Sequence, residues 1–320
     1  GVLRRIAKEK LPTRNMMFCT DDKHIEDIRR EGHINANARM AVAAGIDPID
    51  AIKMASYNAA RAYGIRGVGA IAPGYKADMV LLEDLKDFKV KQVISRFGRP
   101  YTGEEQIPSP ILPPQVFNSV RLPEISKYDL ALRCHVSAPV IKMIPHQLVT
   151  ELVYRDVERD ENGCFIPSEG MVKLAVIERH HATGSMAVGI LEGLGIKHGA
   201  VASTVAHDSH NLVVAGDNDE DMLMAIESLR DCGGGYSVVS RGVVLARLPL
   251  SIAGLMTAAP VNDVLEIQQA LLDALYSLGA KRDSDPLIAL SFMALPVIPA
   301  VKLTDEGLFD AVNFKFIKYN

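Results

Sequence analysis

Apolar residues occur along the chain either in short continuous runs or in longer stretches with helical spacing. The first short run covers residues 15–20 and ends in Thr20, Asp21 and Asp22. Short apolar runs bounded by polar residues are typical of strands buried on both faces. We therefore predict a buried strand at 15–20, followed by a polar loop that contains one short helix.

Helical spacing begins after Asp47, where apolar side chains recur at three- or four-residue intervals as far as Ala62. Asp47 fits the N-cap position, Pro48 the first helical position, and Gly64 the left-handed position just past the helix end. A strand, a loop and a helix in this order form one βα unit, the kind of unit that is repeated in α/β barrels.

The pattern changes at Gly67. Residues 67–83 predict two strands around a turn, with Pro73 and Gly74 at the central positions of a type II turn. Residues 89–101 predict one more strand and a turn, and this small β unit is expected to end near residue 103. The proline-rich stretch 104–115 indicates a linker.

The last 200 or so residues predict a separate α+β domain. Strands are expected at 129–136, 172–179 and 199–205. A helix is expected at 219–232, with Asn218 or Asp219 as its cap and three glycines, 233–235, as its stop. A hairpin is expected around Ser240–Val243, and a second helix with one broad apolar face at 261–278.

Composition and charge exclude several classes of function. Charged side chains of both signs make up 23% of the 320 residues, and the net charge is −4. Without a basic surface the chain is not expected to bind nucleic acid, and without a run of about 18 apolar residues it is not expected to span a membrane. The four cysteines are far apart, which favours reduced thiols in the cytoplasm over a zinc knuckle or a disulfide scaffold. Because the chain begins with Gly1 in a segment unlike a natural start, we expect that an N-terminal region is missing.

The end of the predicted strand at 15–20 is the first candidate for chemistry. In an α/β barrel the strand ends point into the active-site mouth, where a carboxylate can bind a metal and move protons. Adjacent residues of an extended chain point to opposite sides, so we assign Asp21 to the mouth and Asp22 to orienting the loop or a ligand. The alternative is that both carboxylates cap the following helix. His33 is interpreted either as a residue that orients the same loop or as a solvated or capping histidine.

The segment from Phe18 to Leu82 resembles the end of an amidohydrolase-superfamily chain. Its opening FCTDD is similar to the eighth barrel strand, and the pattern A-P-G-x-x-A-D from Ala72 to Asp78 is similar to the small β-sandwich that follows the last barrel helix. Longer stretches resemble the adenine deaminase family in particular: FCTDDKH with EGHIN, VIERHHATG (176–184), STVAHDSHNLVVAGDNDEDM (203–222), LPLSIAGLM (248–256) and SFMALPVIPAVKLTDEGLFD (291–310).

This resemblance implies a fold class of α/β plus α+β. Residues 1–65 would be the last strand and helix of a TIM-barrel-like metallo-hydrolase barrel, residues 66–115 a small β-sandwich part and linker, and residues 116–320 the family's C-terminal domain. The expected function is the hydrolysis of adenine to hypoxanthine and ammonia by water activated on one or two divalent ions, Mn²⁺ or Fe²⁺. Asp21 would bind the ion and carry the proton. The resemblance also implies a homo-oligomer.

The chain departs from the family pattern in one respect. It contains no His-x-His pair, which these enzymes carry on the first barrel strand, so the resemblance implies that this chain alone is inactive. Two alternatives to adenine deamination stay open. One is the hydrolysis of another cyclic amide or amidine, and the other is a non-catalytic binding or assembly module.

Two histidine motifs, His180-His181 and His207-Asp208-Ser209-His210, lie at the ends of predicted strands in the last 200 residues. Neutral imidazoles are common metal ligands, so metal binding is one interpretation. The second is that His180, His207, Asp208 and His210 line the active-site mouth from the added domain. The third is a structural polar network in which the aspartate fixes a histidine tautomer.

Overall fold

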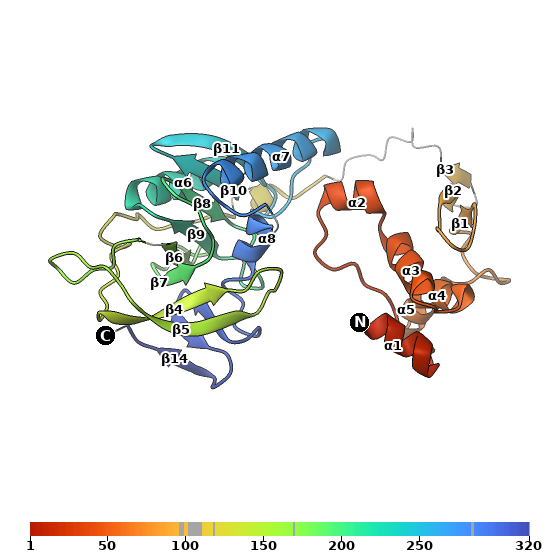
Figure 1. The fold of residues 1–320 in the computed structure, drawn as a ribbon. Coiled ribbons are helices and arrows are strands. Elements are labelled where there is room, and N and C mark those ends of the chain that lie inside the picture. Colours follow the sequence, from red (N-terminus) through yellow and green to blue (C-terminus); the bar gives the residue numbers. More distant parts are fainter. Residues whose placement is uncertain (96–98, 102–110, 118, 169, 283–284, 320) are drawn as a thin grey trace. The chain divides into compact units, whose positions relative to one another are not determined.

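The computed structural model describes residues 1–95, 99–101, 111–117, 119–168, 170–282 and 285–319. The chain divides into two compact units, Gly1–Pro110 and Ile111–Asn320, which we call unit 1 and unit 2 (Figure 1). Residues 104–110 of the predicted linker lie outside the described residues. The predicted division at residues 65 and 115 stays a prediction.

In the described part of unit 1, short helices precede a small antiparallel sheet. The helices are α1 (Val2–Glu9), α2 (Ile25–Glu31), α3 (Ile34–Ala43), α4 (Pro48–Ala55) and α5 (Tyr57–Ala62). The sheet contains β1 (Met79–Leu82), β2 (Val90–Ser95) and β3 (Arg99–Tyr101) in that order. The core is made of the apolar faces of α1, α3 and α4, closed by Phe88.

The start of α4 confirms the sequence pattern around Asp47. The Asp47 side chain accepts hydrogen bonds from the backbone N–H groups of Ile49 and Asp50, and Pro48 occupies the first helical position. The helix breaks at Ser56, which the sequence pattern did not predict, and the Ser56 hydroxyl donates to the Ile52 carbonyl at 2.7 Å. Gly64 has φ +66°, as predicted for the residue past the helix end.

Two of the strands predicted in unit 1 are wrong. Residues 15–20 form no strand, and only alternate side chains there are partly buried. A strand needs a neighbouring strand for its backbone groups, and in the described part of unit 1 the neighbours of this segment are helices; the Phe18 N–H donates to the Met54 carbonyl of α4. Of residues 67–83 only β1 is a strand. The type II turn is confirmed, since Gly74 has φ +80° and the Tyr75 N–H donates to the Ala72 carbonyl.

Unit 2 is built on a mixed sheet of eight strands in the order β11-β10-β8-β9-β6-β7-β4-β5. The strands are β4 (Ser137–Met143), β5 (Thr150–Asp156), β6 (Met171–Ile177), β7 (Met186–Glu192), β8 (Ala200–Ser203), β9 (Leu212–Gly216), β10 (Gly235–Ser240) and β11 (Val243–Pro249). All described neighbours pair antiparallel except β4 and β7, which pair parallel.

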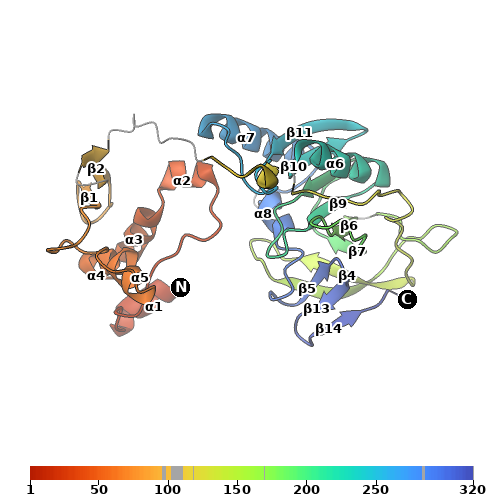
Figure 2. The same ribbon diagram turned by 180° about the vertical axis from the view of Figure 1, so that it is seen from behind.

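Helices cover both faces of this sheet (Figures 1 and 2). The side chains of Ala175 and Ile177 pack with α6 (Asp219–Cys232) on one face. Those of Val172, Leu174 and Val176 pack on the other face with α7 (Val261–Ser277) and α8 (Pro286–Ser291). Because alternate residues of a strand face opposite sides, this burial accounts for the continuous apolar sequence of β6. A sheet of β12 (Val301–Thr304), β13 (Gly307–Asp310) and β14 (Lys315–Ile317) follows, and a short 3₁₀ turn, η1 (Pro114–Phe117), opens the unit.

Several predictions for this unit are confirmed. Helix α6 covers residues 219–232, with Asn218 as its N-cap and Gly233 in the left-handed conformation after it. The β10–β11 hairpin, helix α7 and strands β6 and β8 lie where the pattern predicted them. The strand predicted at 129–136 is wrong, because the chain turns there and β4 begins at Ser137. Among the described residues, no helix is long and apolar enough to cross a membrane.

One lysine of unit 2 is buried without a carboxylate beside it in the described structure. Lys302 of β12 is 0% exposed, and its Nζ donates to the Leu148 carbonyl at 2.8 Å. Burial lowers the pKa of Lys302 to about 8. In the unfolded chain a lysine has a pKa of about 10.4, so between these two values only the unfolded chain binds the proton. The free energy of unfolding therefore rises with pH between these two pKa values. Below the lower value, burial of the charged lysine reduces the free energy of unfolding by its full amount.

We expect Lys302→Met to raise the free energy of unfolding at pH 7 by about 2 kcal/mol, because a buried cation is replaced by an apolar side chain of similar length. The gain over the parent chain should shrink between pH 8 and pH 10, which urea unfolding at several pH values will measure. Lys142→Met is the matched control, since Lys142 is partly exposed and paired with Glu151 at 2.8 Å. A less stable Lys302→Met variant at pH 7 would mean that the bond to Leu148 outweighs the cost of burial.

Candidate functional site

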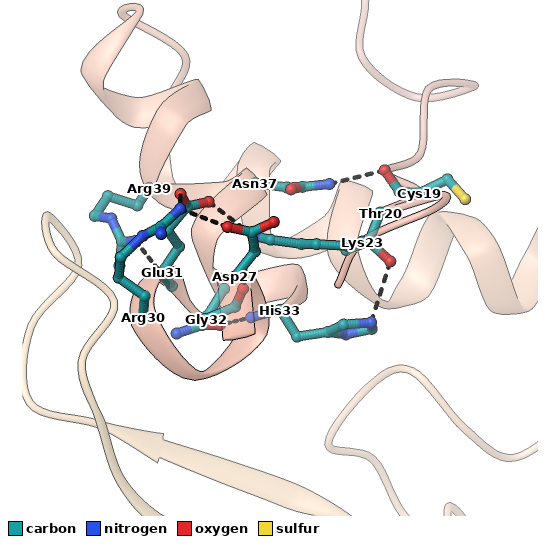
Figure 3. A network of polar contacts seen from close by, with 11 residues as sticks. Cys19, Thr20, Lys23, Asp27, Arg30, Glu31, Gly32, His33, Asn37 and Arg39 are labelled. Carbon is teal, nitrogen blue, oxygen red and sulfur yellow. Dashed lines mark hydrogen bonds and ion pairs between the residues drawn. The ribbon is translucent and has the colours of Figure 1, made fainter. Parts of the chain in front are cut away.

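The segment that carries Asp21 is fixed to the beginning of α3 (Figure 3). The Asn37 Nδ2 donates to the Cys19 carbonyl at 2.9 Å, and the Thr20 Oγ1 lies 3.1 Å from the His33 Nε2. His33 is itself the N-cap residue of α3. Two side chains of one helix start therefore bind the two residues that precede Asp21.

Asp21 has a left-handed backbone with φ 53°, a conformation that few residues other than Gly, Asn and Asp adopt readily. Its Oδ1 accepts the Asp22 N–H at 3.0 Å, and both carboxylates are exposed. This turn places the Asp21 side chain on the surface of unit 1, next to the Thr20–His33 contact. A carboxylate in this position is accessible to an ion or a small substrate.

The chain between Asp21 and His33 forms a loop whose two ends lie close together. The Lys23 Nζ donates to the Gly32 carbonyl at 2.9 Å and forms an ion pair with Glu31 at 3.1 Å. The Glu31 carboxylate also accepts from Arg30 at 2.8 Å, and these two bonds, that of Arg30 first, lower the pKa of Glu31. The Arg39 guanidinium contacts the Glu31 carbonyl at 2.5 Å (Figure 3). These contacts stabilise the loop that brings His33 to Thr20.

Of the residues selected from the sequence in this part of the chain, His33 contacts Thr20, the residue before Asp21, and the Asp22 N–H donates to the Asp21 carboxylate. The structure also identifies Thr20 and Asn37 as the residues that position the segment, which the sequence did not single out. Within the described residues, no group of three or more His, Cys, Asp or Glu side chains is arranged to bind a metal ion. Asp21 is therefore at most one member of a metal site.

The histidine motifs of unit 2 lie together at one edge of the large sheet. Ile177 of β6 is paired with Leu212 of β9, and Ser203 of β8 with Val213 of the same strand. The residues just beyond these pairs, 178–180, 204–207 and 210–211, consequently meet at the same edge. The sequence had placed these residues at strand ends, but it did not show that the ends are adjacent.

The imidazole rings of this cluster contact one another and the backbone. The ring centroids of His207 and His210 are 6.0 Å apart, and His207 lies 4.5 Å from the Phe292 ring. The His180 Nε2 lies 2.8 Å from the Ser209 carbonyl. Burial lowers the pKa of His210, and the nearby positive charges of His207 and Arg179 lower it further. Asp208, between these histidines in the sequence, is exposed.

Glu178 stabilises the turn that follows β6. Burial by itself would raise the pKa of Glu178. The N–H groups of Thr183, His180 and His181 and the Thr183 hydroxyl donate to its carboxylate, and together they lower the pKa to about 2. The donors to the Glu178 carboxylate thus all belong to the turn that this residue begins.

Two residues of this edge were missed at the sequence level. Arg179 follows the wholly buried strand β6 and is itself buried, a position that arginine seldom occupies. Asp305, in the turn between β12 and β13, accepts from the Ser185 hydroxyl at 2.8 Å and from the Asn211 Nδ2 at 3.0 Å. An arginine two residues after an apolar strand was the available signal. For Asp305 the sequence offers none, because its partners are 94 and 120 positions away.

Comparison with known proteins was made for the whole chain. The profile of the adenine deaminase C-terminal domain matches residues 147–315, more than half of the chain, and that of the amidohydrolase family matches residues 4–99. Among similar proteins, an adenine deaminase of Nitratidesulfovibrio vulgaris strain DP4 is 48% identical over 310 residues, which cover 95% of this chain and 53% of the relative. An adenine deaminase of Desulfitobacterium hafniense is 42% identical over 320 residues, which cover 100% of this chain and 56% of the relative.

The chain thus spans about half the length of the curated relatives that it matches. The amidohydrolase match covers the segment that carries Asp21, and the C-terminal domain match covers the histidine cluster of unit 2. Both parts of the resemblance predicted from the sequence motifs are confirmed. The chain belongs to the adenine deaminase family.

Proposed function

We propose that the chain supports the hydrolytic deamination of adenine to hypoxanthine and ammonia. The observation that carries the proposal is the exposed Asp21 carboxylate in the amidohydrolase-matching segment, with the two preceding residues bound by Asn37 and His33. The relatives that share this segment are named adenine deaminases. We therefore propose adenine as the small-molecule substrate.

The Asp21 carboxylate acts as the proton carrier in this proposal. An ionised carboxylate accepts a proton from the attacking water, and the resulting carboxylic acid donates it to the departing amine. The side chain is unprotonated again at the end, so one residue serves both steps. His33 positions Asp21 through the Thr20 hydroxyl, and Asp22 fixes the turn through its N–H bond to the Asp21 carboxylate.

Adenine deaminases of the amidohydrolase family depend on a metal, and we propose one or two ions of Mn²⁺ or Fe²⁺ with Asp21 as one ligand. A bound divalent cation would lower the pKa of water and polarise the substrate. The described residues do not supply the further ligands that such an ion needs, so they do not complete a metal centre. We further propose that His180, His207, Asp208 and His210 form a polar network, which their contacts support, and that the enzyme is a homo-oligomer.

A chimera tests the proposed reaction. This chain replaces the matching part of the Nitratidesulfovibrio vulgaris relative, to which it is 48% identical. We expect the purified chimera, supplied with Mn²⁺, to release ammonia and hypoxanthine from adenine. Ammonia release is followed by a coupled assay and hypoxanthine by chromatography. A folded chimera that binds adenine without turnover would contradict the proposal and favour a binding module, and turnover of other cyclic amidines in place of adenine would favour the second alternative.

A further inference from the structure

The arginine that follows β6 is buried, but only part of its guanidinium is hydrogen-bonded. Arg179 is 1% exposed. Its Nε donates to the His210 carbonyl at 2.5 Å and one terminal nitrogen donates to the Ala253 carbonyl at 3.2 Å. The other terminal nitrogen, Nη1, is buried and has no hydrogen-bond partner among the residues that the structure describes. A buried guanidinium donor left unpaired costs free energy, which favours a ligand that accepts from it.

The charge of Glu178 attracts this guanidinium, but no carboxylate in the described structure is hydrogen-bonded to it or forms an ion pair with it. Arg179 takes part in none of the ion pairs found among the described residues. Its sequence neighbour Glu178 binds the N–H groups of its own turn, and Asp305 accepts from Ser185 and Asn211. Removing a cation from water costs several kcal/mol, so a counter-charge beside this guanidinium would be favourable.

Two further buried atoms without a partner lie on segments that contact Arg179. They are the His210 Nδ1 and the Ser119 Oγ. His210 accepts the Arg179 Nε bond at its carbonyl, and the Arg121 N–H, two residues after Ser119, donates to the Arg179 carbonyl at 2.7 Å. The described residues contain three buried side-chain atoms without a hydrogen-bond partner. All three lie on neighbouring segments at one edge of the sheet. The partly exposed residues His180 and His207 lie at the same edge.

The backbone around the guanidinium is shaped to admit it. Gly254 has φ +70°, and a Cβ at this position would lie 2.8 Å from the Arg179 Nη1 and 3.0 Å from its Cζ. The Thr204 hydroxyl donates to the Gly254 carbonyl at 2.6 Å and fixes this approach. A side chain at residue 254 would displace the guanidinium, so glycine is required here for Arg179 to be buried.

We propose that this edge of unit 2 binds a small oxoanion, a phosphate or a carboxylate, between the Arg179 Nη1 and the His210 Nδ1, which donates as the N–H of the neutral ring. An oxoanion supplies the missing counter-charge and at least two acceptor oxygens, and charge-assisted bonds from arginine to such groups are among the strong hydrogen bonds of proteins. Adenine carries no negative charge, so this ligand is distinct from the substrate of the proposed function.

The test measures the uptake of inorganic phosphate by the 320-residue chain in equilibrium dialysis at constant ionic strength. We expect saturable binding of one phosphate per chain, and Arg179→Gln should weaken it by at least about tenfold. Arg241→Gln is the matched control, since Arg241 is exposed in the β10–β11 turn, and it should bind as the parent does. Acetate in place of phosphate tells a carboxylate site from a phosphate site.

Circular dichroism shows whether each variant is folded. If Arg179→Gln does not fold, His210→Gln decides, with an expected loss of about threefold or more because one of the two donors is removed. Phosphate stabilises many proteins without binding at a site, so a rise in melting temperature alone does not support the proposal. Absence of saturable uptake of either anion by the parent, or equal uptake by the parent and the folded Arg179 or His210 variant, overturns it.

Discussion

In the chimera with the Nitratidesulfovibrio vulgaris relative, Asp21→Asn lowers the kcat for adenine by about a thousandfold. Asparagine keeps the shape of the side chain and an oxygen that accepts the Asp22 N–H, and it adopts the left-handed backbone of this position as readily as aspartate. What it lacks is the ability to carry a proton. Positioned general acid–base groups contribute roughly 10²- to 10⁴-fold in rate, which sets the expected size of the loss.

The control for this prediction is Asp50→Asn. Asp50 is an exposed carboxylate of α4 that pairs with Lys53 at 3.3 Å, and it should leave kcat within about twofold of the parent chimera. Steady-state kinetics and the metal content of each purified protein are measured together, because Asp21 is also proposed as a ligand. If Asp21→Asn retains kcat within tenfold of the parent, Asp21 is not the proton carrier.

Gly235→Ala is expected to destabilise unit 2 by about 4 kcal/mol or to prevent its folding. Gly235 begins the interior strand β10, has φ +130°, and is paired with Pro249 of β11. A Cβ there would lie 1.9 Å from the Leu248 carbonyl oxygen, a backbone atom that cannot move without breaking the β10–β11 pairing. The expected cost combines backbone strain of about 1–3 kcal/mol with overpacking of similar size.

Gly242→Ala in the same hairpin separates these two causes. Gly242 also has a left-handed backbone, with φ +75°, but nothing lies within 4 Å of the position of its Cβ. This control should lose only about 1 kcal/mol, the cost of placing alanine in that conformation. Urea unfolding followed by circular dichroism measures both variants. If both variants lose the same free energy of unfolding, the Leu248 carbonyl moves aside without cost, and only the backbone conformation determines the loss.

Local signals in the sequence were sufficient where a single segment determines its own structure. The cap at Asn218, the glycine after Cys232 and the apolar face of α6 are all properties of one helix, and its predicted bounds are those of the structure. The Pro73-Gly74 turn is likewise encoded by four consecutive residues.

Prediction failed where a segment depends on partners that are distant in the chain. The run Asn15–Thr20 has the composition of a buried strand, yet helices α3 and α4 are its described neighbours. Strand β4 begins after the position predicted for it because pairing with β5 and β7 decides its bounds. Strands β5, β7, β9 and those of the last sheet were not predicted at all.

The candidate site shows the same division. Asp21 and the histidine motifs were chosen from residue type and from resemblance, and the structure supplies what these could not: that His33 reaches Thr20 across 13 positions and that Arg179 lies buried among backbone carbonyls. Neither contact follows from spacing, because the loops that bring the partners together have no regular period.

The closing sheet of unit 2 has a consequence for biosynthesis. The Thr150 hydroxyl at the beginning of β5 donates to the Val301 carbonyl of β12, 151 positions further along the chain. Domains dominated by such distant pairings fold slowly, because chain entropy must be lost before the contacts that compensate for it can form. We therefore expect β5 to lack this partner until β12 has left the ribosome, so that unit 2 reaches its native state only after residues 301–304 have been synthesised.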